Sequence, residues 1–170
     1  RSTLFPYTTL FRSLAESEFI DIFGVENSLT PAMDLFTKLG YLELTCRLNT
    51  DAYLQQIGAG HLPHGAVAVA FSHSGSSADT VKALRLAKSH GAKTIAITNA
   101  IGAPLASWAD VTLLTGRDSH TIYGNAIFSR VADTALVDML YMSVILSDYG
   151  RFSTALDESG RMIRDRVFEN

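Results

Sequence analysis

The feature that most constrains the fold of this 170-residue chain is the alternation of strand-like and helix-like segments along it. Short apolar runs typical of strands occur at residues 18–25, 42–48, 66–71, 93–99 and 111–116. Helical patterns or helical turns occur between and after them, at residues 30–40, 50–59, 78–90, 101–110, 126–150 and 152–168. Crossover connections of this length join parallel strands and place helices on both faces of a sheet. The sequence therefore predicts one domain with a doubly wound α/β fold.

Composition and charge argue against several classes of protein. Hydrophobic residues make up 47% of the chain, but no apolar run approaches the roughly 20 residues that span a bilayer, and no signal peptide is visible. The single cysteine, Cys46, rules out an internal disulfide and fits a reducing compartment, so we expect a cytoplasmic protein without membrane contact. The net charge is −3 and no Lys or Arg cluster occurs, which makes this segment a poor candidate for direct nucleic-acid binding. No spacing of metal-ligand residues is convincing, and we expect neither a metal nor a cofactor.

Residues 1–13, RSTLFPYTTLFRS, show no helix or strand period that continues into the next segment. Thr3 to Ser13 resembles the in-frame translation of a common sequencing-adapter oligonucleotide, and Arg1-Ser2 repeats the last two codons of that oligonucleotide. We therefore expect residues 1–13 to be an artefact joined to a domain at residues 14–170, whose natural N-terminus would be missing. The alternative is a natural, poorly ordered terminus.

The loop after the third predicted strand is rich in hydroxyl groups. It reads FSHSGSSADT from Phe71 to Thr80, with four serines around one glycine: Ser72, Ser74, Gly75, Ser76 and Ser77. It lies where a strand ends and a helix begins, and the free N–H groups and the dipole of a helix N-terminus favour an anion. The pattern predicts a phosphate site, although neither GxxxxGK[ST] nor GxGxxG is present. The alternative is an ordinary helix start, with Ser77 as N-cap, Asp79 in the first turn and the other serines in a turn.

These residues resemble the sugar isomerase (SIS) domain family, whose loop pattern is Ser-x-Ser-Gly-x-Ser/Thr-x-Glu/Asp. Ser72, Ser74, Gly75, Ser77 and Asp79 match that pattern, and FGVENS at 23–28 resembles the first loop of the family, G-x-G-x-S. The resemblance covers residues 18–150. It implies a flavodoxin-like, five-stranded parallel sheet in a three-layer αβα arrangement, a homodimer and a phosphosugar ligand. The implied ligand-binding residues are Ser28, Ser72, Ser74, Gly75, Ser76, Ser77 and Asp79.

One residue departs from the family pattern. Glu26 stands where the first loop of the family has its second glycine. A carboxylate close to a phosphate repels it, unless the side chain points outwards or binds a sugar hydroxyl. The alternative is a solvated loop residue.

SIS domains occur both in enzymes and in regulators. Aldose–ketose isomerisation needs a base and a group that opens the ring, and the candidates are Asp79, His73, His120 and Glu26. If the chain is an enzyme, we expect Asp79 and His120 to be catalytic. The alternatives are a plain first-turn acid for Asp79 and a loop residue bonded to the backbone for His73.

The segment AIFSRVADTALVDMLYMSVIL resembles the ending of RpiR/MurR-type transcriptional regulators, with matches at Ser129, Arg130, Leu136 and Asp138. The arabinose-5-phosphate isomerase branch has Ala-Pro-Thr-x-Ser-Thr before this helix, whereas this chain has TIYGNAIF. The resemblance thus implies a phosphosugar-sensing effector domain that binds its ligand without catalysis, with DNA bound only through a helix-turn-helix domain expected upstream. The alternative is a stand-alone sugar-phosphate isomerase or amino-sugar-phosphate lyase.

The predicted helix at 126–150 is apolar nearly all round, more than packing on one sheet face requires. We expect this helix to be largely buried and to form the dimer contact. The alternative is burial between the sheet and the last helix.

Overall fold

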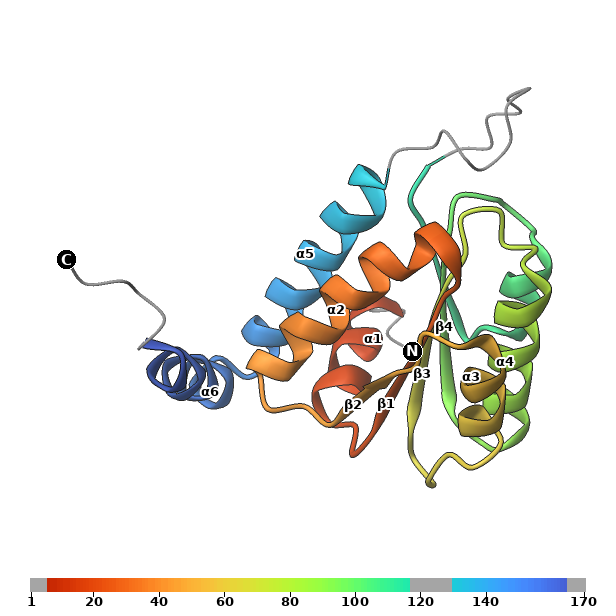
Figure 1. The fold of residues 1–170 in the computed structure, drawn as a ribbon. Coiled ribbons are helices and arrows are strands. Elements are labelled where there is room, and N and C mark those ends of the chain that lie inside the picture. Colours follow the sequence, from red (N-terminus) through yellow and green to blue (C-terminus); the bar gives the residue numbers. More distant parts are fainter. Residues whose placement is uncertain (1–5, 117–129, 165–170) are drawn as a thin grey trace, which may run out of the picture.

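The computed structural model describes residues 6–116 and 130–164 of the chain, and its centre is a parallel sheet (Figure 1). The five strands are β1 (Ile20–Phe23), β2 (Cys46–Leu48), β3 (Val67–Phe71), β4 (Lys93–Thr98) and β5 (Val111–Leu114). They pair in the order β2-β1-β3-β4-β5, and every pair is parallel. This order reverses between β1 and β3, as in flavodoxin-like sheets, so the predicted fold class is confirmed.

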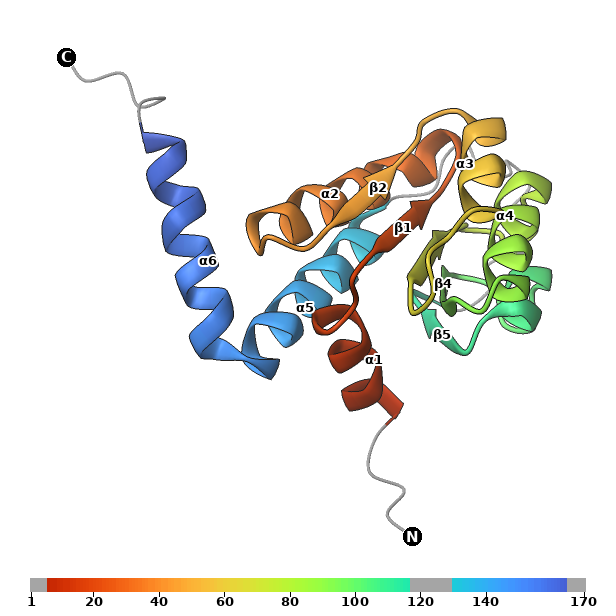
Figure 2. The same cartoon turned by 90° about the horizontal axis from the view of Figure 1, so that it is seen from below.

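Helices cover both faces of the sheet, which gives three layers (Figures 1 and 2). On one face lie α1 (Pro6–Ala15), α2 (Leu29–Tyr41) and α5 (Val131–Ser147). On the other lie α3 (Ala52–Ala59), α4 (Ala78–Ser89) and the short 3₁₀ helix η2 (Pro104–Trp108). The view in Figure 2 separates these two sets on either side of the strands.

The central strand β3 shows how the sequence builds two cores. All five of its residues are buried, and successive side chains point to opposite faces. Val67, Val69 and Phe71 join the core under α2 and α5, whereas Ala68 and Ala70 join the core under α3 and α4. The small alanine side chains let the second helical layer approach the sheet closely.

Two helix starts differ from the sequence-based prediction. The helix predicted at residues 30–40 begins earlier, because α2 starts at Leu29 and continues directly from the 3₁₀ turn η1 (Glu26–Ser28). The helix predicted at residues 50–59 begins later, at Ala52, and Asp51 is its N-cap, since its Oδ1 accepts a hydrogen bond of 2.9 Å from the amide of Leu54. Asp51 has the extended backbone that a cap requires, whereas Ser28, the residue before α2, is helical and makes no capping bond.

The N-terminal segment forms a helix that the sequence analysis did not expect. Within α1, Leu10 and Leu14 are buried in the core beneath α5, and they lie four residues apart on one helical face. The helical period of the apolar residues in this segment was overlooked because the helix is only ten residues long. This packing does not bear on the origin of residues 1–13, which stays a prediction.

The C-terminal region consists of two helices that meet at Asp148. Beyond α5, α6 (Tyr149–Met162) begins with Asp148 as its N-cap, whose Oδ1 accepts a hydrogen bond of 3.1 Å from the amide of Arg151. This helix projects away from the sheet (Figures 1 and 2), and its buried residues are Phe152 and Ala155.

The burial of α5 is one-sided. Val137, Leu140, Val144 and Ile145 are buried, whereas Met139, Met142 and Leu146 are 50–69% exposed. Within a single chain the expectation that this helix is largely buried is therefore wrong, and so is the alternative that the last helix covers it. The cause is the direction of α6, which leaves the outer face of α5 open.

Candidate functional site

A cavity of about 480 Å³ lies at the carboxyl edge of the sheet, where the order of the strands reverses. Two loops and the starts of two helices line it. The first loop, after β1, contributes Val25, Glu26, Asn27 and Ser28. The second loop, between β3 and α4, contributes Ser72, His73, Ser74, Ser76 and Ser77, and α4 adds Asp79. The residue before α5, Arg130, completes the wall.

The conformation of the second loop requires a glycine at position 75. This residue has a φ of +62°, a left-handed conformation that costs little only for glycine. It is also enclosed, because a Cβ added there would lie 2.4 Å from Cβ of Ala103 and 2.9 Å from Oγ1 of Thr98. Gly75 therefore shapes the loop and is not itself part of the cavity wall.

Backbone hydrogen bonds fix the second loop to the neighbouring elements. The amide of Ser72 donates to the carbonyl of Ile97 on β4, and the amide of Asn99 donates to the carbonyl of His73, each over 3.0 Å. The carbonyl of Gly75 accepts a bond of 2.9 Å from the amide of Leu105 on η2. The serine side chains are thus carried on a backbone that two other elements hold in place.

The start of α4 leaves its backbone donors without a side-chain cap. Ser77 occupies the N-cap position, as expected, but its side chain accepts no hydrogen bond from the helix backbone. Its Oγ instead accepts a bond of 3.3 Å from Oγ1 of Thr80. The alternative in which Ser77 is an ordinary capping residue therefore lacks its capping bond. Ser77 and Asp79 at the start of α4 both line the cavity, whose wall is rich in hydroxyl groups, and the N-terminus of a helix favours an anion.

Asp79 stands in the first turn of α4 with one oxygen already engaged. Nε2 of Gln56, a residue of α3, donates a hydrogen bond of 3.0 Å to Oδ1 of Asp79. The Asp79 side chain is exposed on the cavity side, so the other oxygen can reach a ligand hydroxyl.

The first loop is held by a side chain. The buried Gln55 on α3 accepts a hydrogen bond of 3.2 Å from the amide of Gly24 and donates bonds of 2.7 and 2.8 Å to the carbonyls of Gly24 and Asn49. Ser28 is 8% exposed and lines the cavity, as the resemblance implied.

Glu26 adopts a φ of +52°, in the left-handed region that favours glycine. This explains why the family pattern has a glycine at this position. The side chain is exposed and lines the cavity, so its carboxylate adds negative charge to the wall.

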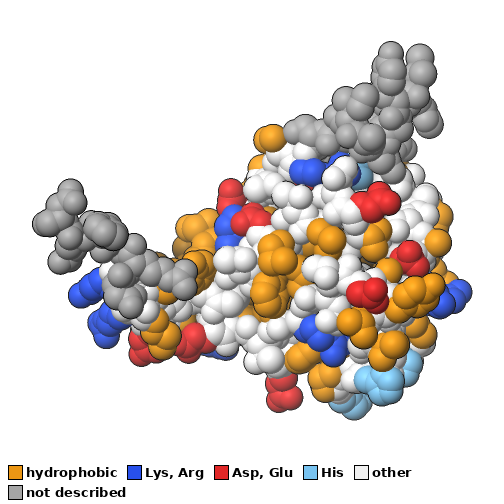
Figure 3. All heavy atoms as spheres, in the orientation of Figure 1, with side chains coloured by type: hydrophobic (Ala, Val, Ile, Leu, Met, Phe, Trp, Pro, Cys, Tyr) orange, Lys and Arg blue, Asp and Glu red, His pale blue; other side chains and the backbone are white. Residues whose placement is uncertain are grey.

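Charged side chains gather at this end of the molecule, where Figure 3 shows basic, histidine and acidic side chains close together beside the grey atoms. Burial and the positive charge of Arg130 lower the pKa of His73, and the negative charge of Asp133 opposes this only in part. His73 is therefore neutral at pH 7. Among the residues that the structure describes, no group of three or more His, Cys, Asp and Glu could hold a metal ion.

The structure brings most of the predicted residues together. Six of them line one cavity: Ser28, Ser72, Ser74, Ser76, Ser77 and Asp79. Gly75 supports the loop from behind, and His120 lies outside the described residues. Arg130 was noted only as part of the RpiR-type ending, yet it is a wall residue. Its place before the apolar segment of α5 was the available signal, because the helix that follows the last strand must begin at the carboxyl edge.

The fold and this cavity define an α/β domain with a hydroxyl-lined cavity at the switch point of a parallel sheet. The family model for the SIS domain matches residues 13–143, and the chain belongs to this family. Within residues 6–116 and 130–164, no helix is long and apolar enough to cross a membrane.

The similar proteins include transcriptional regulators. An uncharacterized HTH-type transcriptional regulator of Caldanaerobacter subterraneus subsp. tengcongensis is 30% identical over 163 residues, which are 96% of this chain and 58% of that protein. The HTH-type transcriptional regulator RpiR of Escherichia coli is 26% identical over 143 residues, 84% of this chain and 48% of that protein. The chain thus spans about half the length of these relatives and is homologous to the SIS part of RpiR-type regulators.

Solved structures share the fold. The Vibrio vulnificus NanR protein complexed with ManNAc-6P superposes with a TM-score of 0.87 at 24% identity, over 95% of this chain and 61% of that chain. The sugar isomerase domain of an RpiR transcription factor from Sphaerobacter thermophilus gives a TM-score of 0.79 at 22% identity, over 92% of this chain and 87% of that chain. At these identities the likeness establishes the fold alone.

Proposed function

We propose that this chain is the phosphosugar-sensing effector domain of an RpiR-type transcriptional regulator that works in the cytoplasm. Its homology to the SIS part of HTH-type regulators supports this, because those relatives are about twice as long as the matched segment. DNA binding belongs to a helix-turn-helix domain outside this segment. Ligand binding shifts the population of two arrangements of the whole regulator and thereby its affinity for DNA.

The observation that carries the proposal is the position of Ser72, Ser74 and Ser77 on one cavity wall, beside the uncapped start of α4. A phosphate dianion has several acceptor oxygens, and short hydroxyls together with free amides can donate to them without a metal. Asp79 and Glu26 lie on the same wall and can accept hydrogen bonds from sugar hydroxyls. A sugar phosphate combines both kinds of group.

A second candidate function is isomerisation or elimination on a sugar phosphate. It rests on the Asp79 carboxylate, which lines the cavity and could serve as a base. The bond from Gln56 to Asp79 favours the binding role, because it fixes the orientation of the carboxylate and occupies one of its two oxygens. Incubation with sugar phosphates, followed by ¹H NMR, distinguishes the two functions: a regulator leaves the sugar unchanged and an enzyme converts it.

We propose that the regulator is a homodimer through the outer face of α5. Met139, Met142 and Leu146 are exposed there, and a second copy of the chain would cover this apolar surface. Analytical ultracentrifugation tests the proposal: a dimer is expected at micromolar concentration, and a monomer under the same conditions contradicts it. Leu146→Glu is expected to shift the equilibrium towards the monomer.

A thermal-shift screen tests the phosphosugar proposal. The panel holds N-acetylmannosamine 6-phosphate, glucosamine 6-phosphate, fructose 6-phosphate, arabinose 5-phosphate and ribose 5-phosphate, each beside its unphosphorylated sugar. At least one phosphosugar is expected to raise the melting temperature, because a ligand bound only by the folded state stabilises it. The unphosphorylated sugars are expected to have no effect. A panel without a response contradicts the proposed function.

A further inference from the structure

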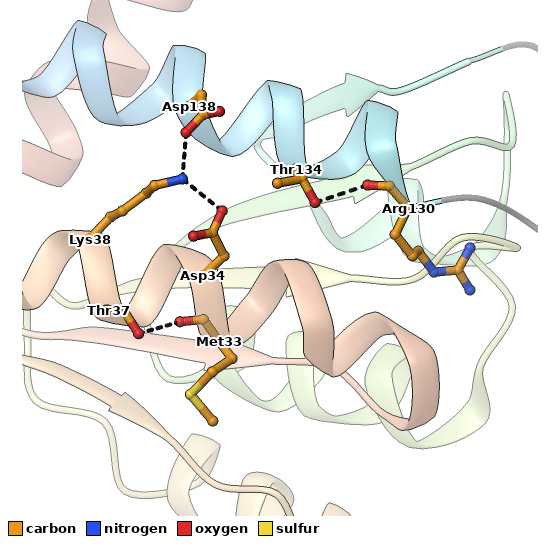
Figure 4. Close-up of polar contacts among 7 residues, drawn as sticks. All are labelled: Met33, Asp34, Thr37, Lys38, Arg130, Thr134 and Asp138. Atoms are coloured by element: carbon orange, nitrogen blue, oxygen red, sulfur yellow. Dashed lines mark hydrogen bonds and ion pairs between the residues drawn. The ribbon is translucent and has the colours of Figure 1, made fainter.

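Arg130 brings a buried positive charge to the cavity wall from outside the serine loop. It is the residue immediately before α5, and its side chain is only 12% exposed. Figure 4 shows this side chain pointing away from the cluster of Asp34, Lys38 and Asp138 and towards the loops at the end of the sheet. It contacts the same cavity as Ser72 and Ser74.

The hydrogen-bonding groups of this guanidinium are not satisfied within the described part of the chain. Its Nε and Nη1 atoms are buried and have no hydrogen-bond partner there. The nearest carboxylate oxygen, Oδ2 of Asp133, lies 3.9 Å from Nε, which is too far for a hydrogen bond. Asp133 therefore offsets part of the charge but leaves the donors open, and burying charged donors without partners is costly.

The charge balance of the wall also requires a cation. Among the described lining residues, Glu26 and Asp79 carry negative charges and Arg130 carries the one positive charge. A phosphate dianion that meets two carboxylates needs a compensating charge beyond hydroxyls and amides. A guanidinium is well suited to this task because its planar donors match phosphate oxygens.

We propose that Arg130 is a ligand-binding residue whose guanidinium donates hydrogen bonds to phosphate oxygens of the ligand. The inference rests on the proposed function and adds a second contact element, the start of α5, to the serine loop. It also gives a reason for the open donors, since a bound phosphate supplies the acceptors that the protein lacks. Because Arg130 directly precedes Val131, an occupied cavity restrains the first turn of α5, the helix with the exposed apolar face.

Isothermal titration with inorganic phosphate and with the phosphosugar that gives the largest thermal shift tests this proposal. Arg130→Met keeps the apolar stem and removes the charge, and it is expected to weaken binding by about 30-fold, as for a lost charge-assisted hydrogen bond. Arg130→Lys keeps the charge but lacks the planar set of guanidinium donors. Its affinity for the ligand is expected to lie between that of Arg130→Met and that of wild type. Arg85→Met is the matched control, because Arg85 lies on the exposed side of α4, over the Trp108 ring. This variant is expected to bind the ligand with the affinity of wild type.

Two further variants separate ligand contact from a purely structural role. Asp133→Asn releases the guanidinium and is expected to bind phosphate at least as tightly as wild type, whereas a structural Arg130–Asp133 pair predicts weaker binding. Arg130→Met combined with Asp133→Asn leaves no unpaired charge and covers the case in which Arg130→Met does not fold. If the wild type binds and the Met variants bind equally well, Arg130 is not a ligand contact. A wild type that binds nothing contradicts the proposed function itself.

Discussion

The two loops that line the cavity meet the same backbone requirement in different ways. They follow β1 and β3, which pair from Ile20↔Val67 to Phe23↔Ala70, and each contains a residue with positive φ. In the second loop this residue is Gly75, enclosed by Ala103 and Thr98. In the first loop it is Glu26, which is exposed. Only glycine fits a position where both the backbone conformation and the surrounding space are restricted. Where only the conformation is restricted, another residue can occupy the position at the cost of backbone strain.

The loops also differ in how they are held. The second loop is fixed mainly by backbone bonds to β4 and η2, which depend little on side-chain identity, and Oγ1 of Thr98 adds one bond of 3.2 Å to the carbonyl of His73. The first loop depends on the amide group of one side chain, Gln55. Substitutions should therefore affect the second loop through its glycine and its hydroxyls, and the first loop through Gln55 and Glu26.

The largest effect is expected for Gly75→Ala. The added methyl group meets Ala103 in a left-handed backbone, and the combined overpacking and strain should cost about 3 kcal/mol of unfolding free energy and abolish ligand binding. Urea denaturation and titration measure both effects. Gly40→Ala is the control, because its Cβ meets nothing within 4 Å and helix propensity should make it slightly stabilising. If Gly75→Ala is as stable as wild type, the second loop is not as closely packed as described.

Ser74→Ala combined with Ser77→Ala should remove ligand binding while leaving the fold intact. Each lost hydroxyl contact to a charged phosphate costs about 1.5–3 kcal/mol, so the affinity should fall by at least about 100-fold. The melting temperature without ligand should fall only slightly, because the bonds that these two hydroxyls accept, from Oγ1 of Thr80 and the amide of Ser76, are long at 3.3 and 3.2 Å. Ser89→Ala, at the far end of α4, serves as the control and should bind normally. Unchanged affinity in the double variant would place the ligand elsewhere.

Gln55→Leu should loosen the first loop. It leaves the buried amide and carbonyl of Gly24 and the carbonyl of Asn49 without partners, which should lower the unfolding free energy by about 2–3 kcal/mol. Hydrogen exchange should speed up at residues 24–28 and stay unchanged at residues 72–77. Equal acceleration in both loops would show that they are not held independently.

Glu26→Gly should give the smallest effect and a favourable one. It removes the left-handed strain and should stabilise the protein by about 0.5–1 kcal/mol, and it removes a carboxylate from the cavity wall, which should tighten phosphate binding. Glu26→Gln removes only the charge and should tighten binding without adding stability. If Glu26→Gly is destabilising, the first loop does not need a left-handed residue here.

Most of the fold could be predicted from local patterns in the sequence. Strand-length apolar runs and helix periods are short-range signals, and the five strands were found because residues such as Val67 to Phe71 are buried on both faces. The four serines around Gly75 marked the site, because a hydroxyl-rich turn before a helix has few structural uses. α1 was missed because ten residues give a weak period.

Other features of the site depend on contacts between distant segments. Arg130 lies more than fifty residues beyond Ser77, and only the packing of α5 on α2 brings it to the cavity. The bond from Lys38 to Asp138 that joins these helices is equally invisible in the sequence (Figure 4). The direction that α6 takes at Asp148, which leaves the outer face of α5 exposed, could not be foreseen either.

The measurement that tests the central claim most directly is a ¹H–¹⁵N NMR titration of the protein with the phosphosugar that gives the largest thermal shift. If a phosphate rests on the serine loop and on the start of α4, the backbone amide signals of residues 74–79 should shift most, with smaller changes at residues 25–28. Shifts confined to another surface, such as the groove beside Phe11, Leu136 and Met139, would contradict the claim, and so would saturating ligand that leaves residues 74–79 unperturbed.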